Sequence, residues 1–474
     1  MARTIALKSV DMTTGSIPKK MMTYTIPLII AGWLQIFYSA ADLIVCGNYG
    51  SPNSVGAISA TNSITYLIIS VFIGFGVGAN VAVSKAYGAR NQANAEKIIG
   101  TTYMLAIVSS IVLAALGVSL SRVLLQALGT PEDIIDLSTT YMMIYFAGVP
   151  FNIFYNFGAS LLRGMGDTLK PFLYLLIAGI INVALNLLFV IVFKMDVAGV
   201  ALTTVISQFI SAFLVTITLI RGNGYALLRI SRLRFYKNEV VDILKVGLPA
   251  GIQGSLFSIS NVLIQSTINS FGAAADTGSG AANSIESFLN ASQDGFAQAG
   301  VAFVGANYGA KKANRIKSSI LWSLIYGVTI SSILGVAIYF AASPLLQLYI
   351  DVNEPMGLES LAFGLEKLKI NSITYMVFAV SVSLSQAQKG LGHSTISMII
   401  SLVGICVFRI FFIYVIFPIN KTSQFLFYSY PISWALTAVG QIICMAIILP
   451  KELKKVNAAA LKEESELTVQ EMDN

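Results

Sequence analysis

Residues 62–90 read NSITYLIISVFIGFGVGANVAVSKAYGAR, and residues 283–311 read NSIESFLNASQDGFAQAGVAFVGANYGAK. Aligned without a gap, the two stretches share an Asn-Ser-Ile start, a central glycine (Gly74 and Gly295) and a Tyr-Gly-Ala ending that a basic residue follows. Both are long enough to cross a bilayer as a helix. One stretch lies in each half of the chain, so the pair indicates an internal duplication.

Further matches at nearly the same separation extend the duplication. Pro27 corresponds to Pro249, Gly50 to Gly272, and the segment Arg163-Gly164-Met165-Gly166 to Lys389-Gly390-Leu391-Gly392. So many ordered matches are not explained by coincidence. Each half contains an even number of expected spans, so both halves enter the membrane from the same side. Parallel repeats of this kind are related by an axis along the membrane normal, with a central cavity between them.

Composition places the chain in the membrane. Hydrophobic residues make up 55% of its 474 positions, charged residues only 11%, and the mean hydropathy is +0.75. Soluble domains carry about 25% charged residues. The net charge of +7 does not indicate nucleic-acid binding, because the basic residues lie in short loops between apolar runs, where they act as topology signals.

Twelve apolar runs of spanning length predict twelve transmembrane helices in two pseudo-symmetric six-helix bundles around a central cavity. The runs cover residues 22–47, 55–84, 98–121, 136–162, 171–193, 197–220, 246–272, 279–306, 318–343, 364–388, 395–417 and 426–450.

Basic residues alternate between the two sides of this arrangement. One set of loops holds only Arg122, Lys194, Lys367, Lys369 and Lys421, while the termini and the other loops hold all the rest except Arg409, which lies inside a helix. The basic side is cytoplasmic by the positive-inside rule, so we expect a multi-pass protein of the cytoplasmic (inner) membrane with both termini in the cytoplasm. We expect no cleavable signal before the first helix. The expected parts are an N-terminal segment (1–21), an N-terminal bundle (22–220), a basic linker (221–245), a C-terminal bundle (246–450) and a charged tail (451–474).

Short motifs in these repeats resemble the multidrug and toxic compound extrusion (MATE) family of cation-coupled antiporters. The resembling pieces are Thr14-Gly15-Ser16-Ile17, Ala41-Asp42-Leu43-Ile44-Val45, Leu162-Arg163-Gly164-Met165-Gly166-Asp167, Gly199-Val200-Ala201-Leu202-Thr203-Thr204 and Ile285-Glu286-Ser287-Phe288. The resemblance implies export of drug-like, cationic or amphipathic organic compounds in exchange for inward Na⁺ or H⁺. We expect a monomer whose partners are its small-molecule substrate and membrane lipids, with no nucleic acid, no cofactor and no metal other than a transported Na⁺.

An ionisable group at bilayer depth costs at least about 2.5–3.5 kcal/mol and is a functional candidate by default. Asp42 is such a group, and its counterpart in the second half is Ile264. By resemblance to one bacterial branch of the family, Asp42 belongs to an ion-coupling cluster in the N-terminal half. The resemblance gives its neighbours as Tyr145, Asn156, Asn182, Asn186 and Thr203. That branch usually has an aspartate at the position of Asn186, so the choice between Na⁺ and H⁺ stays open.

The eighth expected helix carries a polar stripe at steps of three and four residues: Asn283, Glu286, Asn290, Gln293 and Asp294. A polar stripe cannot face lipid. We expect it to form a negative cavity wall that attracts cationic substrates, or else a structural network with Asn261, Gln265 or Asn269 of the seventh helix. Tyr38 is a further expected cavity residue. Arg409 is expected to pair with an acid of the C-terminal half or to extend toward an interface.

Two other functions stay open at this point. A lipid-linked glycan flippase of the same superfamily is the alternative transporter, although its anionic substrate does not suit acidic cavity residues. An intramembrane enzyme is the alternative from another class. The chain contains no HExxH, Gly-x-Ser-x-Gly or paired catalytic aspartate motif, and such motifs carry the chemistry of membrane hydrolases. Its three cysteines and single histidine show no metal-ligand spacing.

Overall fold

The computed structural model describes residues 9–127, 129–222 and 225–472. Parts of the expected N-terminal segment (1–8), linker (223–224) and tail (473–474) lie outside this description. The described residues are almost entirely helical and contain twelve long helical segments. Eleven of these are long and apolar enough to cross a membrane. The other, α8, is also long enough, but its polar residues lower its hydropathy.

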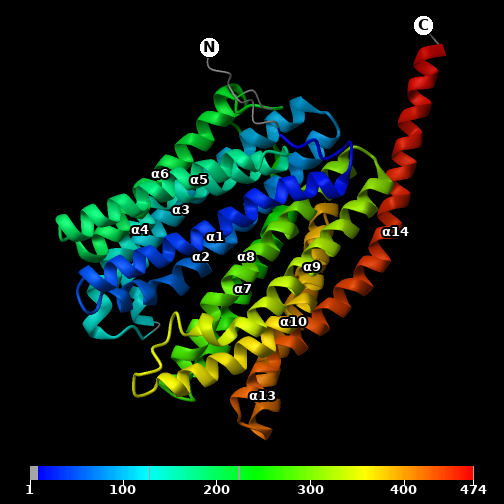
Figure 1. The fold of residues 1–474 in the computed structure, drawn as a ribbon. Coiled ribbons are helices and arrows are strands. Elements are labelled where there is room, and N and C mark those ends of the chain that lie inside the picture. Colours follow the sequence, from blue (N-terminus) through cyan, green and yellow to red (C-terminus); the bar gives the residue numbers. More distant parts are fainter. Residues whose placement is uncertain (1–8, 128, 223–224, 473–474) are drawn as a thin grey trace. The chain divides into compact units, whose positions relative to one another are not determined.

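The first half contains six of the long segments (Figure 1). They are α1 (Ile17–Tyr49), α2 (Ser54–Gly88), α3 (Gln92–Ala127), α4 (Glu132–Gly164), α5 (Leu169–Asn186), which continues as the π-helix η1 (Leu187–Val192), and α6 (Asp196–Arg221). A 3-10 turn, η2 (Ile230–Arg232), lies in the expected linker.

The second half repeats this order. It contains α7 (Lys237–Asn269), α8 (Ala273–Gly309), α9 (Ala313–Leu346) and α10 (Gly357–Leu391). The eleventh segment alternates between α and wider turns: α11 (Ser394–Ser401), η3 (Leu402–Val407), α12 (Phe408–Phe411), η4 (Phe412–Ile416) and the 3-10 turn η5 (Phe417–Ile419). The twelfth is α13 (Ser423–Phe427) followed by α14 (Ser429–Met472), which extends as one helix through most of the expected tail (Figure 1).

The chain divides into two compact units. One comprises Met1–Asp11 and Ile26–Ser255, and the other Met12–Thr25 and Leu256–Asn474. The boundary therefore falls inside α1 and inside α7, and not in the linker. Instead, the described linker residues pack on α3 of the first unit, where Arg229 forms an ion pair with the buried Glu96 at 3.0 Å.

Each unit is built around one central helix. In the first unit α4 packs against α2, α3 and α6, and in the second α10 packs against α8, α9 and α14. Small residues allow this close approach, as in membrane bundles generally. At Gly117 of α3, for example, an added Cβ would lie 2.1 Å from the Phe146 ring of α4. Equivalent helices occupy equivalent places in the two units, which confirms the prediction of two related bundles.

Candidate functional site

A chain of hydrogen bonds joins Asp42 of α1 to α5 and α6 within the first unit. The Asn186 amide nitrogen donates to the Asp42 carboxylate, and the Asn186 carbonyl oxygen accepts from the Thr203 hydroxyl. The same amide nitrogen lies 3.3 Å from the Asn182 carbonyl oxygen. Asn186 and Thr203 are fully buried. The structure thus brings together four of the six residues that the resemblance assigned to ion coupling.

The backbone of α5 changes at this cluster. Asn186 is the last α-helical residue, and the six residues after it form the π-helix η1. Wider turns of this kind occur frequently at functional sites. Asn182 and Asn186 are separated by one turn and therefore share a face of α5. This face is buried and points toward α1 and α6 rather than toward solvent.

A second contact attaches α1 to α5 one turn before Asp42. The Tyr38 ring packs directly on the backbone of Gly179, where an added Cβ would lie 1.8 Å from the ring carbon Cζ. The Tyr38 hydroxyl donates to the Leu176 carbonyl at 3.4 Å. Tyr38, expected to line a cavity, is thus half-buried against α5 and helps to fix the position of Asp42.

Tyr145 and Asn156 of α4 differ in their relation to this cluster. Tyr145 stacks on Tyr141, with ring centroids 6.2 Å apart, and Tyr141 lies within electrostatic range of Asp42. Sequence reasoning missed Tyr141, although it precedes Tyr145 by one helical turn and shares its face. Asn156 donates to the carbonyl and side-chain oxygens of Asn152. No described hydrogen bond joins it to the Asp42 cluster.

The polar stripe of α8 divides into two faces. Asn283, Asn290 and Asp294 are exposed, whereas Glu286 and Gln293 are only 6% and 1% exposed. Successive residues of a helix differ by about 100°, so the exposed and the buried group point in directions that differ by roughly 40–100°. The surface of the bundle runs between them. The stripe therefore has an exposed part and a buried part, and the negative cavity wall stays a prediction for the exposed part.

The buried members of the stripe bind residues of their own unit. Glu286 accepts from the Asn371 amide of α10 at 2.8 Å. Gln293 donates to the Ala379 carbonyl at 3.2 Å and accepts from the Ser331 hydroxyl at 3.0 Å. These contacts form the structural network that was the alternative interpretation of the stripe, with partners on α9 and α10 instead of α7.

Buried basic residues accompany the acids of α8. Lys367 and Lys389, both counted as loop residues in the sequence, lie inside α10 and are 0% and 5% exposed. Lys367 lies within electrostatic range of Glu286, and Lys389 within that of Asp294. Each of the two acids of the α8 stripe thus has a cationic neighbour that reduces, but does not remove, the negative field expected there.

Arg409 is buried in α12 and does not form the expected pair with an acid. Its guanidinium donates to the Asn261 side-chain oxygen of α7 and to the Ser433 hydroxyl, both at 3.1 Å, and lies over the Tyr430 ring. Asn261 therefore accepts a hydrogen bond from Arg409 and does not join the polar stripe of α8. Gln265, a second of the three expected partners on α7, donates to Asp276 at 2.8 Å near the α7–α8 turn.

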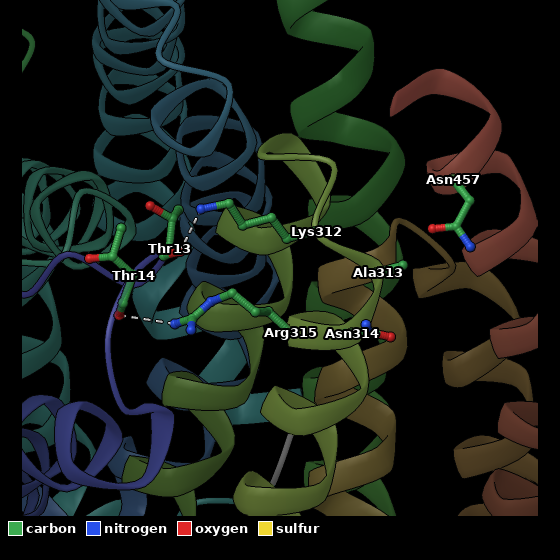
Figure 2. A pocket seen from close by; sticks show the side chains of 7 residues that line it. All are labelled: Thr13, Thr14, Lys312, Ala313, Asn314, Arg315 and Asn457. Carbon is green, nitrogen blue, oxygen red and sulfur yellow. Dashed lines mark hydrogen bonds between the residues drawn. The ribbon is translucent and has the colours of Figure 1, made fainter. Parts of the chain in front are cut away.

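A separate polar hollow lies within the second unit, beside the start of α9. It has a volume of about 630 Å³, and Figure 2 shows the seven residues that line it: Thr13, Thr14, Lys312, Ala313, Asn314, Arg315 and Asn457. Lys312 donates to the Thr13 carbonyl at 2.9 Å, and Arg315 donates to the Thr14 carbonyl at 3.0 Å. These bonds fasten Thr13 and Thr14 to the start of α9 within the second unit. None of the expected site residues lines the hollow.

Comparisons with known proteins agree on one family. The MatE family model matches residues 27–188 and 249–415. A probable multidrug resistance protein of Bacillus subtilis is 28% identical over 398 residues, which cover 82% of this chain and 85% of the relative. A protein of Shewanella oneidensis named as an FAD transporter is 26% identical over 357 residues, covering 74% of this chain and 78% of the relative.

A solved structure has the same fold. It is the outward-facing conformation of a multidrug resistance MATE family transporter of the MOP superfamily, with a TM-score of 0.88. The likeness covers 94% of this chain and 99% of the solved chain at 20% sequence identity. The two matched segments of the family model correspond to the two halves of the internal duplication.

Proposed function

The chain belongs to the MATE family of multidrug efflux transporters, and from this premise we propose that it is a secondary active antiporter for organic, drug-like compounds. Members of this family are multi-pass membrane transporters rather than enzymes, and the comparisons favour drug export over glycan flipping. In our proposal the driving ion is Na⁺ or H⁺, moving inward as the compound leaves the cytoplasm.

The observation that carries the proposal is the hydrogen-bonded chain from Asp42 to Thr203. It places one carboxylate among amide and hydroxyl oxygens in a buried part of the unit. Oxygen ligands of this type suit a hard cation. A carboxylate is also a group that can take up and release a proton. Asp42, Asn182, Asn186 and Thr203 would hold Na⁺ through their oxygens, while Asp42 alone would carry H⁺.

The cluster can also transmit ion binding to the helices. Deprotonated Asp42 accepts the Asn186 amide hydrogen and so fastens α1 to α5. Protonation or a bound cation removes negative charge from the carboxylate and weakens this charge-assisted hydrogen bond. We infer that ion occupancy sets how firmly α1 is held against α5, and that this change accompanies the transport cycle.

The substrate side of the proposal rests on the exposed face of α8. Asn283, Asn290 and Asp294 would be very unfavourable against lipid, so this face meets water. The Asp294 carboxylate on it would attract cationic or amphipathic compounds. The Shewanella relative is named as an FAD transporter, so anionic aromatic compounds belong among the substrates to be tested.

Orientation and oligomeric state complete the proposal. The positive-inside rule supports both termini in the cytoplasm of the inner membrane. We propose a monomer as the transporting form.

Dye efflux driven by separate gradients tests the function. Proteoliposomes or everted vesicles containing the protein would be loaded with a fluorescent organic cation, and a Na⁺ gradient and a pH gradient would be applied one at a time. We expect one gradient to drive dye movement and empty vesicles to show none. Movement that requires ATP, or that neither gradient alters, would contradict the proposal.

A further inference from the structure

Two buried cations of the second unit lie beside one aromatic ring. The Lys367 ammonium of α10 is 5.8 Å from the centre of the Tyr430 ring, and the Arg409 guanidinium of α12 is 4.5 Å from it. The two charges are therefore no more than about 10 Å apart. Lys367 is 0% and Arg409 4% exposed. None of the ion pairs among the described residues includes either of them.

The charges around Tyr430 do not cancel. Glu286 lies within electrostatic range of both cations, but among the described residues it forms no ion pair with either of them, so neither cation has a carboxylate in direct contact. Burying an uncompensated charge costs several kcal/mol. The Asn371 side-chain oxygen, also buried and hydrogen-bonded through its nitrogen to Glu286, has no hydrogen-bond partner among the described residues. The cluster is thus incomplete in both charge and hydrogen bonding.

An asparagine with an exposed side covers each cation. The Asn283 carbonyl oxygen of α8 accepts from Lys367, which also donates to the Ser279 hydroxyl at 2.9 Å. The Asn261 carbonyl oxygen of α7 accepts from Arg409 at 3.1 Å. A neutral amide oxygen is a weaker acceptor for a cation than a carboxylate or phosphate oxygen. Rotation of one side chain at each position would open the cations to an anionic group.

Aromatic side chains continue from this cluster into the unit. Trp434 lies 5.9 Å from Tyr430 and 5.1 Å from Tyr375, measured between ring centres. The backbone on both sides of Arg409 consists of the π-helices η3 and η4, a feature that is common at functional sites. The Tyr430 and Trp434 rings meet edge to face, and Trp434 is tilted against Tyr375. Cations beside such a cluster of aromatic rings suit a ligand that has both an aromatic ring and a negative charge.

We propose that Lys367 and Arg409 form a subsite for the carboxylate or phosphate group of an aromatic anion, which displaces the amide oxygens of Asn283 and Asn261. The proposal rests on the proposed transport function and extends its substrates to aromatic compounds with an acidic group. Glu286 opposes this binding through its negative charge and keeps the empty subsite from carrying two uncompensated cations.

A matched pair of flavins tests the subsite on the purified full-length protein in detergent, with no ion gradient. FMN and riboflavin share one ring system and differ in the phosphate of FMN. We expect FMN to bind at least about tenfold more tightly, because charge-assisted hydrogen bonds form only with the phosphate. Inorganic phosphate should compete with FMN but not with riboflavin. Equal affinities for the two flavins would overturn the proposal.

Variants separate ligand binding from damage to the fold. Lys367→Gln and Arg409→Gln should each weaken FMN binding about tenfold, whereas Lys369→Gln, an exposed lysine of the same helix, should leave it unchanged. Glu286→Gln keeps the shape and the Asn371 contact but removes the negative charge, so it should strengthen FMN binding severalfold. A purely structural network predicts weaker binding for that variant, and such a result would refute the subsite.

Further outcomes distinguish the substrate subsite from a lipid-binding site and from the antiport proposal. Loss of FMN binding on addition of phosphatidylglycerol would assign the cations to a lipid headgroup and overturn the substrate subsite. Failure of ion-driven efflux with intact FMN binding would contradict the antiport proposal and leave the subsite supported. Intact ion-driven efflux together with equal affinities for FMN and riboflavin would support the antiport proposal and overturn the subsite.

Discussion

Replacing Gly179 by alanine tests how α1 is held against α5. The new methyl group would lie 1.8 Å from Cζ and 2.0 Å from Cε2 of Tyr38, far below van der Waals contact, so the ring has to leave α5. Overpacking of this kind costs about 1–3 kcal/mol. Alanine gains about 0.5–1 kcal/mol over glycine inside a helix. The net loss of unfolding free energy should therefore lie between about 0 and 2.5 kcal/mol.

A double-mutant cycle with Tyr38→Ala isolates this contact. Without the ring, Gly179→Ala meets little resistance and should become neutral or stabilising by about 0.5–1 kcal/mol, from its helix propensity alone. Thermal or denaturant unfolding of the four proteins in one detergent measures the coupling. Ion-driven efflux by Gly179→Ala should also slow, since Asp42 is one turn beyond Tyr38. An alanine that has the same effect in both backgrounds would refute the assigned contact.

Two further substitutions probe the ion and substrate groups. Asn186→Asp places a second carboxylate beside Asp42, so the affinity for the coupling cation should rise by at least tenfold. The affinity can be measured as the protection that the cation gives against thermal unfolding. Unchanged protection would show that Asn186 is not part of the ion site. Asp294→Asn removes the exposed carboxylate of α8 and should lower the export of cationic dyes severalfold while leaving neutral compounds unaffected. Equal losses for both kinds of compound would instead indicate a folding role for Asp294.

The architecture was accessible from the sequence because repetition and hydropathy report on whole helices. Pro27 and Pro249, or Tyr87 and Tyr308, mark equivalent places without any knowledge of packing. Helix ends were less accessible. The helices α1 and α7 begin several residues before the apolar runs, at Ile17 and Lys237, because helical hydrogen bonding continues beyond the apolar part of a span.

Side-chain partners were predicted only where the family resemblance supplied them. Asp42, Asn182, Asn186 and Thr203 come together as it implied. On α8 the three-and-four spacing was correctly recognised, but spacing gives a face and not the position of the bundle surface. That surface passes between Asn283 and Glu286.

Lys367 shows a second reason for the missing partners. A lysine near the end of an apolar run resembles a topology signal in the sequence. Only its packing against Ser279 and Asn283 reveals a buried cation. The balance of charge in the C-terminal half depends on such residues, and composition alone does not locate them.

The central claim is that Asp42 couples ion entry to export. The most direct measurement compares wild type and Asp42→Asn in proteoliposomes, in the ion-driven efflux assay and in a gradient-free exchange of labelled for unlabelled substrate. Asparagine keeps an oxygen acceptor for the Asn186 amide but carries no charge and no exchangeable proton at that oxygen. We predict that ion-driven efflux is lost while gradient-free exchange persists at a similar rate. Wild-type rates of ion-driven efflux by the Asp42→Asn protein would contradict the account.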